Sequence, residues 1–207
     1  MSRAKGFISF EGIEGSGKST QSRLFADYLL GKGHDVVHTA EPGGTDIGLK
    51  IRKLLLEPNN HMDALTELLL YYASRAQHVQ EVILPAIREN KIVITDRFTD
   101  STVAYQGYAR GLSMDIIQSL NDIVLSDLTP DMTFLLDMDV REGLRRNRDA
   151  MKEDRFELET VAFHERVRQG FHEIAEKEPG RIKIIDASKS KEEVTGQIIK
   201  VFEQSWH

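Results

Sequence analysis

The stretch GIEGSGKS, residues 12–19, decides the fold of this chain. It has the spacing Gly-x4-Gly-Lys-Ser, it follows the apolar run 6–10, which has the length of a strand, and it precedes a segment of helical periodicity. In that context the glycines let the chain wrap tightly, and backbone N–H groups, a helix N-terminus and a lysine converge on an anion. The stretch therefore predicts a phosphate-binding loop, and a glycine-rich turn without a ligand is the weaker alternative.

Two side chains of this loop have expected tasks. Lys18 is expected to reach the β- and γ-phosphates of a nucleotide, and the Ser19 hydroxyl is expected to ligate Mg²⁺. Glu14 is unexpected, because every other group of the loop favours negative charge in a ligand. The residues expected to contact the nucleotide are Gly12, Ile13, Glu14, Gly15, Ser16, Gly17, Lys18, Ser19 and Thr20.

Five short β-rich runs alternate with segments of helix length along the chain. They are residues 6–10, 35–40, 91–96, 132–137 and 181–186. Such alternation is typical of a parallel sheet flanked by helices, so the predicted fold class is α/β with a five-stranded parallel sheet. Three runs end in a carboxylate, at Asp96, Asp137 and Asp186. Because ligands of such sheets bind beyond the carboxyl ends of the strands, we expect the chemistry at this edge.

Two of the intervening segments carry clear helix signals. A long helix is expected from residue 63 to about 89, with a kink at Pro85, whose ring removes a backbone donor. A second helix is expected over residues 113–127, with Ser113 as its N-cap and Asp115 in its first turn.

Composition narrows the class of protein. The chain has 207 residues, of which 40% are apolar and 29% charged, so we predict one globular domain over residues 1–207. It has no cysteine, which excludes disulfides and thiolate metal sites and favours a reducing, cytoplasmic location. No apolar run could span a bilayer, and the N-terminus lacks a signal-peptide core, so no membrane association is expected. A net charge of -6 argues against binding to nucleic acid.

Asp96 and Arg97 stand together at the end of a predicted strand. An aspartate there can hold the water shell of Mg²⁺, and an arginine can grip a phosphate through two hydrogen bonds. For an isolated Asp-Arg pair, a surface ion pair is about equally good as an explanation. The neighbouring phosphate-binding loop favours the functional one.

A basic cluster interrupts this acidic chain at residues 144–148, and Asp154-Arg155-Phe-Glu157 follows shortly after it. Taken alone, such a cluster is usually a solvated helix face. In an enzyme that transfers phosphate, closing arginines can instead neutralise charge that develops on the transferred group.

Tyr71 and Arg75 lie one helical turn apart, so an aromatic ring and a planar hydrogen-bond donor share a helix face. Core packing is the default for the tyrosine, whereas an arginine is less easily buried. The seven histidines show no metal-ligand spacing, and we interpret them as structural or exposed.

Together these stretches resemble the thymidylate kinase family in its bacterial form, over essentially the whole chain. The phosphate-binding loop alone marks only a superfamily, whereas the string Asp-Arg-x3-Ser-Thr-x2-Ala-Tyr-Gln from residue 96 is far more specific. The matching stretches are 10–20, Glu41-Pro-Gly-Gly-Thr45, Tyr71-Tyr-Ala-Ser-Arg75, Asp96-Arg-Phe-Thr-Asp-Ser-Thr102, Ala104-Tyr-Gln-Gly-Tyr108 and Asp154-Arg-Phe-Glu157.

The resemblance implies the P-loop nucleoside monophosphate kinase fold, with a mobile lid at about residues 146–156. It implies transfer of the γ-phosphoryl group of ATP to dTMP, giving dTDP for dTTP synthesis, with Mg²⁺ as cofactor held by Ser19 and Asp96. The acceptor-binding residues that it implies are Glu14, Arg52, Tyr71, Arg75, Arg97, Ser101, Thr102, Tyr105 and Gln106.

Individual roles also follow from the resemblance. Arg97 would bind the acceptor phosphate, with Arg52 as a second clamp, while Tyr71 would stack on thymine and Arg75 would donate to its O4. Thr102 would lie near N3 of the base, and Tyr105 would crowd the 2′ position and so favour deoxyribose. Glu14 would accept a hydrogen bond from the 3′-hydroxyl, so its charge faces sugar and not phosphate.

The catalytic groups implied are Lys18, Arg97 and an arginine of the lid. Residues 13–16 contain no arginine, whereas the lid segment is rich in them, so we predict that the lid supplies it, with Arg148 and Arg155 as candidates. Members of the family are usually homodimers built from long helices. The apolar positions Ile116, Ile117, Leu120, Ile123 and Val124 suit a dimer interface, but they suit the core of a monomer equally well.

Two rival functions stay open from the sequence. Another nucleoside monophosphate kinase would differ only in the base it accepts, which Tyr71, Arg75 and Thr102 would decide. A P-loop nucleotide-switch binding module is less favoured, because the chain has no Asn-Lys-x-Asp motif for reading guanine.

Overall fold

The computed structural model describes residues 6–149 and 154–206. Its elements are β1 (Phe7–Glu11), α1 (Lys18–Gly31), β2 (Val36–Ala40), α2 (Asp46–Leu56), α3 (Ala64–His78), η1 (Val79–Ile83), α4 (Leu84–Arg88), β3 (Ile92–Asp96), α5 (Thr99–Thr102), η2 (Val103–Ala109), α6 (Met114–Leu125), β4 (Met132–Asp137), α7 (Val140–Asp149), α8 (Val161–Lys177), β5 (Ile182–Asp186) and α9 (Lys191–Ser205). In these described residues five strands pair in parallel in the order β2-β3-β1-β4-β5. The predicted α/β class is confirmed, and each predicted run corresponds to one strand with ends that differ by at most one residue.

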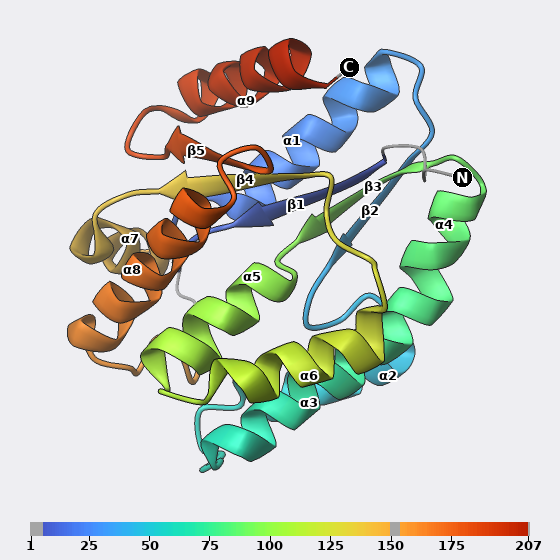
Figure 1. The fold of residues 1–207 in the computed structure, drawn as a ribbon. Helices are drawn as coiled ribbons and strands as arrows, with labels where there is room; N and C mark the ends of the chain where they lie inside the picture. Colours follow the sequence, from blue (N-terminus) through green and yellow to red (C-terminus); the bar gives the residue numbers. More distant parts are fainter. Residues whose placement is uncertain (1–5, 150–153, 207) are drawn as a thin grey trace.

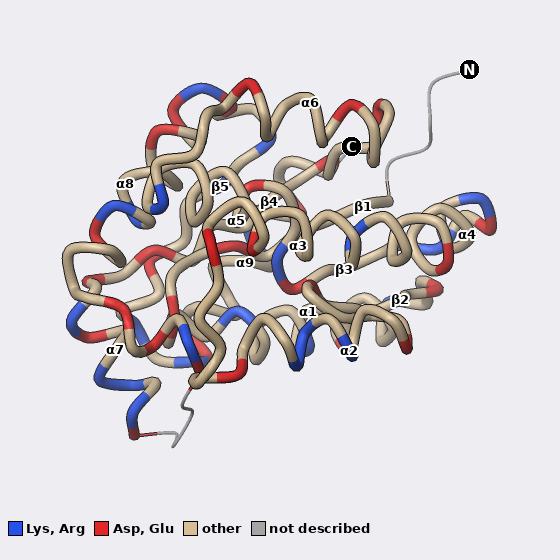
Figure 2. The backbone as a smooth tube through the Cα atoms, turned by 90° about the horizontal axis from the view of Figure 1, so that it is seen from below, with Lys and Arg blue, Asp and Glu red and all other residues tan. Residues whose placement is uncertain are grey.

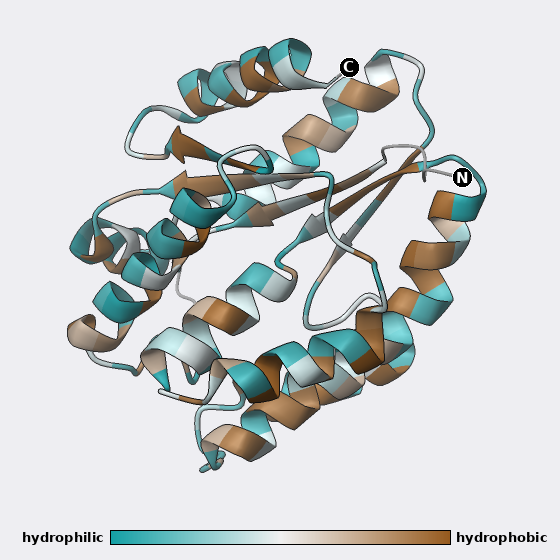
Figure 3. Cartoon of the chain, in the orientation of Figure 1, coloured by the Kyte–Doolittle hydropathy of each residue, from teal (hydrophilic) through white to brown (hydrophobic). Residues whose placement is uncertain are grey.

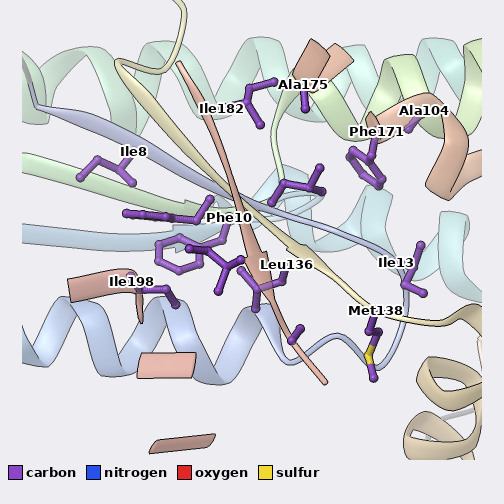
Figure 4. Packing of buried hydrophobic residues seen from close by; sticks show 14 of the residues in the cluster. Ile8, Phe10, Ile13, Ala104, Leu136, Met138, Phe171, Ala175, Ile182 and Ile198 are labelled. Atoms are coloured by element: carbon purple, nitrogen blue, oxygen red, sulfur yellow. The ribbon is translucent and has the colours of Figure 1, made fainter. Parts of the chain in front are cut away.

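Helices cover both faces of the sheet, as Figure 1 shows. Helices α1 and α9 pack on one face, and α3, α4, α5 and α8 lie on the other, where α6 packs outside α3. Strand β1 is central, so all five of its residues are buried, which explains its apolar composition. Figure 4 shows Ile8 and Phe10 of β1 packed with Leu136 of β4 and Ile198 of α9 in the main core.

The helix predicted over 63–89 is present but not uniform. It runs as α3, the π-helical segment η1 and the short helix α4, with Pro85 in the first turn of α4. Proline has no backbone N–H, so one hydrogen bond of a regular α-helix cannot form, and the wider turn of η1 accommodates this loss. The irregularity therefore lies just before Pro85, the residue that was predicted to cause a kink. Helix α6 begins as predicted, with the Ser113 hydroxyl accepting from the Asp115 N–H at 3.2 Å.

The carboxyl ends of the strands lie along one edge of the sheet, where Asp96 pairs in register with Phe10 of β1. Only Asp96 of the three strand-end aspartates lines the large cavity described below. Asp137 pairs with Arg168 at 2.7 Å and His172 at 3.0 Å, and Asp186 accepts from Ser188 at 2.6 Å. Among these three aspartates, Asp96 therefore remains the candidate for the predicted chemistry at this edge.

Apolar residues are concentrated in the strands, and charged residues lie along the outer helices. Figure 2 shows basic and acidic residues intermixed along the outer helices, and Figure 3 shows the strands as mainly hydrophobic and the helices as mixed. Across the described part of the chain, no helix has both the length and the apolar character needed to cross a membrane.

Candidate active site

The phosphate-binding loop connects β1 to α1, as its sequence predicts. Gly15 and Gly17 have positive φ values of 73° and 89°. Residues other than glycine adopt such backbone angles only with strain. Helix α1 starts at Lys18 with no side-chain cap and no acidic residue in its first turn. Its N–H groups and positive dipole end are therefore available to an anion.

Lys18 folds back over this loop and is almost fully buried. Its Nζ donates to the Ile13 carbonyl at 2.6 Å and to Ser16 Oγ at 3.3 Å. Burial, with the positive charge of Arg97 as a second cause, lowers the pKa of Lys18 to about 8. The loop thus carries a lysine whose positive charge becomes more favourable when phosphate arrives.

Ser19 and Asp96 meet at the start of α1 and the end of β3, where the Ser19 hydroxyl donates to Asp96 Oδ2. Oδ1 of Asp96 is buried and has no hydrogen-bond partner among residues 6–149 and 154–206. A hydroxyl and an orphaned carboxylate oxygen are the ligands that Mg²⁺ and its water shell take. These residues therefore fit the predicted cation.

Arg97 lies directly after β3 in a left-handed conformation, with φ 71°. Its Nη1 donates to the Gly12 carbonyl at 3.1 Å and to Ser101 Oγ at 3.0 Å. Its Nη2 donates to Glu14 Oε1 at 2.8 Å and to the Tyr105 hydroxyl at 3.2 Å. The structure thus brings Arg97, Ser101, Tyr105 and the phosphate-binding loop together.

This geometry gives Glu14 a partner inside the protein. Burial alone would raise the pKa of Glu14, but the positive charges of Arg97 and Lys18 and a hydrogen bond from Tyr105 lower it below its usual value. Glu14 is therefore a carboxylate that balances Arg97 when no substrate is bound. The predicted hydrogen bond from a 3′-hydroxyl needs a ligand and stays a prediction.

Two of the three guanidinium nitrogens of Arg75 are held by hydrogen bonds to neighbouring residues. Arg75 is 1% exposed, its Nε donates to Glu41 at 2.7 Å, and its Nη2 donates to the Phe98 carbonyl at 3.1 Å. Its Nη1 is buried and finds no hydrogen-bond partner in the part of the chain that the structure describes. The same is true of Thr102 Oγ1. Because both residues line the cavity, they offer two unused polar groups to a ligand.

Tyr105 and Gln106 are presented by the π-helical segment η2. Tyr105 packs among Phe156, Phe163 and Phe171 and donates its hydroxyl to Glu14. Gln106 donates to the buried Glu67 at 2.8 Å. Segments of this kind are frequent at functional sites, because the wider turn re-aims side chains that an α-helix would direct elsewhere.

One cavity of about 980 Å³ connects these groups. It extends from the phosphate-binding loop and Asp96 past Arg97 to Tyr71, Arg75 and Thr102. Arg52 also lines it and donates to the Pro42 carbonyl at 3.0 Å. The volume and the two polar ends suit two ligands placed end to end.

The two predicted lid arginines lie differently. Arg148 is exposed near the end of α7 and does not line the cavity. Arg155 is mostly buried, pairs with Glu67 at 2.6 Å and donates to the Leu55 carbonyl at 3.0 Å. Residues 150–153 of the predicted lid lie outside the described residues.

Three buried carboxylates were missed by reasoning from the sequence. Glu11 accepts hydrogen bonds from the Phe98 N–H at 2.7 Å and from Ser101 Oγ at 2.5 Å. Glu41 forms an ion pair with Arg75. Glu67 accepts a hydrogen bond from Gln106 and forms ion pairs with Arg110 and Arg155. A signal existed for each. Glu11 and Glu41 stand at strand ends, the rule that pointed to Asp96, and Glu67 lies one helical turn before Tyr71.

Comparisons with known proteins show what this chain is similar to. The sequence model described as thymidylate kinase matches residues 10–198. The chain is 51% identical over 195 residues to a thymidylate kinase of Halothermothrix orenii, with 93% of each chain covered, and 47% identical to one of Nostoc sp., with 97% of this chain and 98% of that one covered. A crystal structure of thymidylate kinase from Ehrlichia chaffeensis superposes with a TM-score of 0.79 at 40% identity, covering 96% of this chain and 99% of that one.

Proposed function

Since this chain belongs to the thymidylate kinase family and acts as an ATP-dependent dTMP kinase, we propose that the cavity described above holds ATP and dTMP end to end. The observation that carries this is the pairing of two unlike ends in a single cavity. One end offers the phosphate-binding loop with Lys18, and the other offers Arg75 Nη1 and Thr102 Oγ1, which have no partners within the described residues. A donor and a hydroxyl match O4 and N3–H of thymine.

The phosphoryl transfer needs no covalent enzyme intermediate, because positioning and charge neutralisation carry most of such a reaction. Lys18 leaves the Ile13 carbonyl to bind the donor phosphates, and Arg97 binds the acceptor phosphate with Arg52 as a second clamp. Ser19 and the water shell on Asp96 would hold Mg²⁺, which supplies further neutralisation of the phosphate charges. The two anions can then approach in line.

Arg97 and Glu14 exchange partners in this proposal. In the structure they form an ion pair at 2.8 Å. When dTMP enters, its phosphate takes Arg97 and its 3′-hydroxyl donates to Glu14, so neither charge stays unpaired. Tyr105, held against Glu14 and Arg97, lies where it would crowd a ribose 2′-hydroxyl.

Residues 146–156 form the lid of this single domain in the proposal, and either Arg148 or Arg155 reaches the transferred phosphate on closure. The supporting observation is that Arg146, Asn147, Asp154 and Phe156, close to both candidates in sequence, line the cavity. Replacing each candidate by alanine tests this. If turnover stayed within about threefold of wild type in both variants, the lid would not supply the catalytic arginine.

The location and assembly of the protein are proposed on chemical grounds. A cytoplasmic location is supported by the absence of cysteine, and cell fractionation would test it. A homodimer is supported by exposed apolar residues on α2, α3 and α6, and of the positions predicted from the sequence, Ile116 and Ile123 are exposed whereas Ile117 is buried.

An acceptor panel tests the function most directly. With ATP as donor and ADP formation coupled to a dehydrogenase signal, we expect dTMP to be phosphorylated at least about tenfold more efficiently than dCMP, UMP or GMP. A preference for one of those acceptors would favour another nucleoside monophosphate kinase. ATP hydrolysis that is equally fast with and without any acceptor would favour a nucleotide-switch module.

A further inference from the structure

Glu41 is buried, follows β2 directly and lines the same cavity as Arg75. Its Oε2 accepts from Arg75 Nε at 2.7 Å and its Oε1 accepts from His78 Nδ1 at 2.9 Å. The nitrogen of His78 must be the donor, because an ionised carboxylate can only accept. Both oxygens of Glu41 are thus occupied by side chains three residues apart on α3.

His78 is itself held from its other side, since its Nε2 shares a hydrogen bond of 2.7 Å with Thr39 Oγ1. The backbone of Glu41 is fixed as well, because its N–H donates to the Asp96 carbonyl at 2.9 Å. Burial alone would raise the pKa of Glu41, but Arg75 and His78 lower it below its usual value. Glu41 is therefore a charged and immobile group.

The consequence appears at the Arg75 guanidinium. Its carbon lies 5.1 Å from the Tyr72 ring centroid and 5.3 Å from the Phe98 ring centroid, and Nε and Nη2 are bound to Glu41 and to the Phe98 carbonyl. A flexible side chain has become a rigid plane in a residue that lines the cavity, and its Nη1 is buried with no hydrogen-bond partner among residues 6–149 and 154–206. A preorganised donor discriminates between bases better than a mobile one, since it cannot turn away from a mismatched group.

We propose that Glu41 is a positioning residue that sets base selectivity, by fixing Arg75 so that Nη1 can donate only to a base with an acceptor at position 4. The proposal rests on the function assigned above, in which Arg75 faces O4 of the pyrimidine. Thymine and uracil carry the acceptor O4, whereas cytosine carries the donor N4–H₂ at the same place.

The test is Glu41→Gln, assayed with dTMP, dUMP and dCMP. Glutamine keeps the shape but can accept from only one of the two donors. We expect kcat/KM to fall for dTMP and dUMP by the same factor, about tenfold to a hundredfold, mainly through KM, whereas kcat/KM for dCMP does not fall. The ratio of kcat/KM for dTMP to kcat/KM for dCMP then drops, while the corresponding ratio for dTMP and dUMP stays constant.

A merely structural role predicts a different pattern. A structural role would lower kcat/KM for all three acceptors by the same factor. If the ratio of kcat/KM for dTMP to kcat/KM for dCMP stayed within about twofold of wild type, the proposal would be overturned. If the wild-type enzyme itself failed to distinguish dTMP from dCMP, the assigned function would fail instead, so the two failures are distinguishable.

Two further variants separate selectivity from loss of stability. His78→Leu keeps the ion pair between Glu41 and Arg75 and removes the second support, so we expect a smaller drop of the dTMP-to-dCMP ratio, about threefold to tenfold. His78→Leu can replace Glu41→Gln as the test if Glu41→Gln does not fold. Arg181→Gln breaks another mostly buried ion pair, with Asp100 at 2.7 Å, and should lower stability without changing either ratio. An unchanged ratio in His78→Leu would also count against Glu41 as the positioning group.

Discussion

Lys18 and Arg97 place two positive charges beside one phosphate-binding loop before any phosphate is bound. Their mutual repulsion adds to the burial that lowers the pKa of Lys18 to about 8, and Glu14 offsets it only in part. A bound phosphate would offset the repulsion between the two cations, so this pair of positive charges favours an anionic ligand.

A pH dependence of ATP use follows from this pKa. Lys18 must be protonated in the free enzyme to bind phosphate, so kcat/KM for ATP should be flat below pH 8 and should fall about tenfold per pH unit above it. With ATP bound, the phosphates raise the pKa of the lysine, so kcat should fall only at higher pH. A pH–rate profile from pH 6 to 10 measures both. Lys18→Arg, whose charge does not titrate in this range, should abolish the decline, and a wild-type profile flat to pH 9.5 would contradict the assignment.

Glu11 shows the opposite electrostatic situation, since no cation contacts its carboxylate among the described residues. Burial and the nearby negative charge of Asp100 raise its pKa to about 7, although hydrogen bonds from Ser101 and Phe98 and the charge of Arg97 counteract the shift. Between pH 4.5 and 7 the folded protein keeps a proton that the unfolded chain has released. The contribution of Glu11 to stability is therefore fully present below pH 4.5 and is lost as pH rises through 7.

Glu11→Gln should isolate that contribution, because glutamine does not titrate. We expect the free energy of unfolding of wild type, minus that of the variant, to decrease by about 2–3 kcal/mol between pH 5 and pH 8. Urea unfolding of both proteins at a series of pH values measures the difference. Parallel stability curves would mean that Glu11 has an ordinary pKa in the folded state.

At the scale of elements, the phosphate-binding loop and α7 are in direct backbone contact. A Cβ atom added to Gly15 would lie 1.9 Å from the carbonyl oxygen of Gly143 in α7, and backbone on both sides cannot move aside as a flexible side chain would. A Cβ atom added to Gly17 meets no heavy atom within 4 Å. The two glycines share a positive φ and differ in the space around them, which makes them a matched pair.

Gly15→Ala should therefore separate α7 from the loop, whereas Gly17→Ala adds only backbone strain of about 1–2 kcal/mol. We expect kcat/KM for ATP to fall at least about a hundredfold in Gly15→Ala, because a misplacement of 1 Å in a positioning loop costs that much, and about tenfold in Gly17→Ala. Steady-state kinetics with saturating dTMP measures the two losses. Equal losses would show that strain, and not the contact with α7, limits the loop.

The elements themselves could be predicted from local sequence, and the contacts between them could not. The strands were found because buried parallel strands are continuous apolar and β-branched runs. The π-helical segments η1 and η2 were missed, since five to seven residues are too few to separate their period from that of an α-helix. Glu41 and Arg75 are 34 residues apart, so their pairing depends on how β2 and α3 meet in the fold. The proposal that Tyr71, Arg75 and Thr102 contact the base came from the resemblance to a family, and not from the physical properties of these residues.

At the scale of the whole molecule, the sheet edge explains why one cavity can serve two substrates. Strands β1 and β3 are neighbours, so the phosphate-binding loop after β1 and Arg97 after β3 are adjacent although more than 80 residues separate them. Helix α3, which lies on one side of the sheet in Figure 1, carries Tyr71 and Arg75, and both residues line the cavity. The residues that line this cavity thus come from a single chain, and the residues exposed on the outer faces of α2, α3 and α6, such as Leu54, Leu69 and Ile123, are not among them.

These outer faces expose apolar side chains that suit an interface between two copies of the chain. Ile123 is 76% exposed on α6, and α2 and α3 add further exposed apolar side chains, at Leu54 and Leu69. If they form a homodimer interface, Ile123→Glu buries an unpaired carboxylate at a cost of about 3 kcal/mol or more, which raises the dimer dissociation constant by at least about a hundredfold. Light scattering across a dilution series should then show a monomer for this variant. It should show a dimer for wild type and for Ile184→Glu, whose isoleucine is also exposed, at 50%, but lies on β5. Turnover per chain at saturating substrate should survive in the monomer, because the cavity is lined within one chain, and a wild-type monomer would refute the interface.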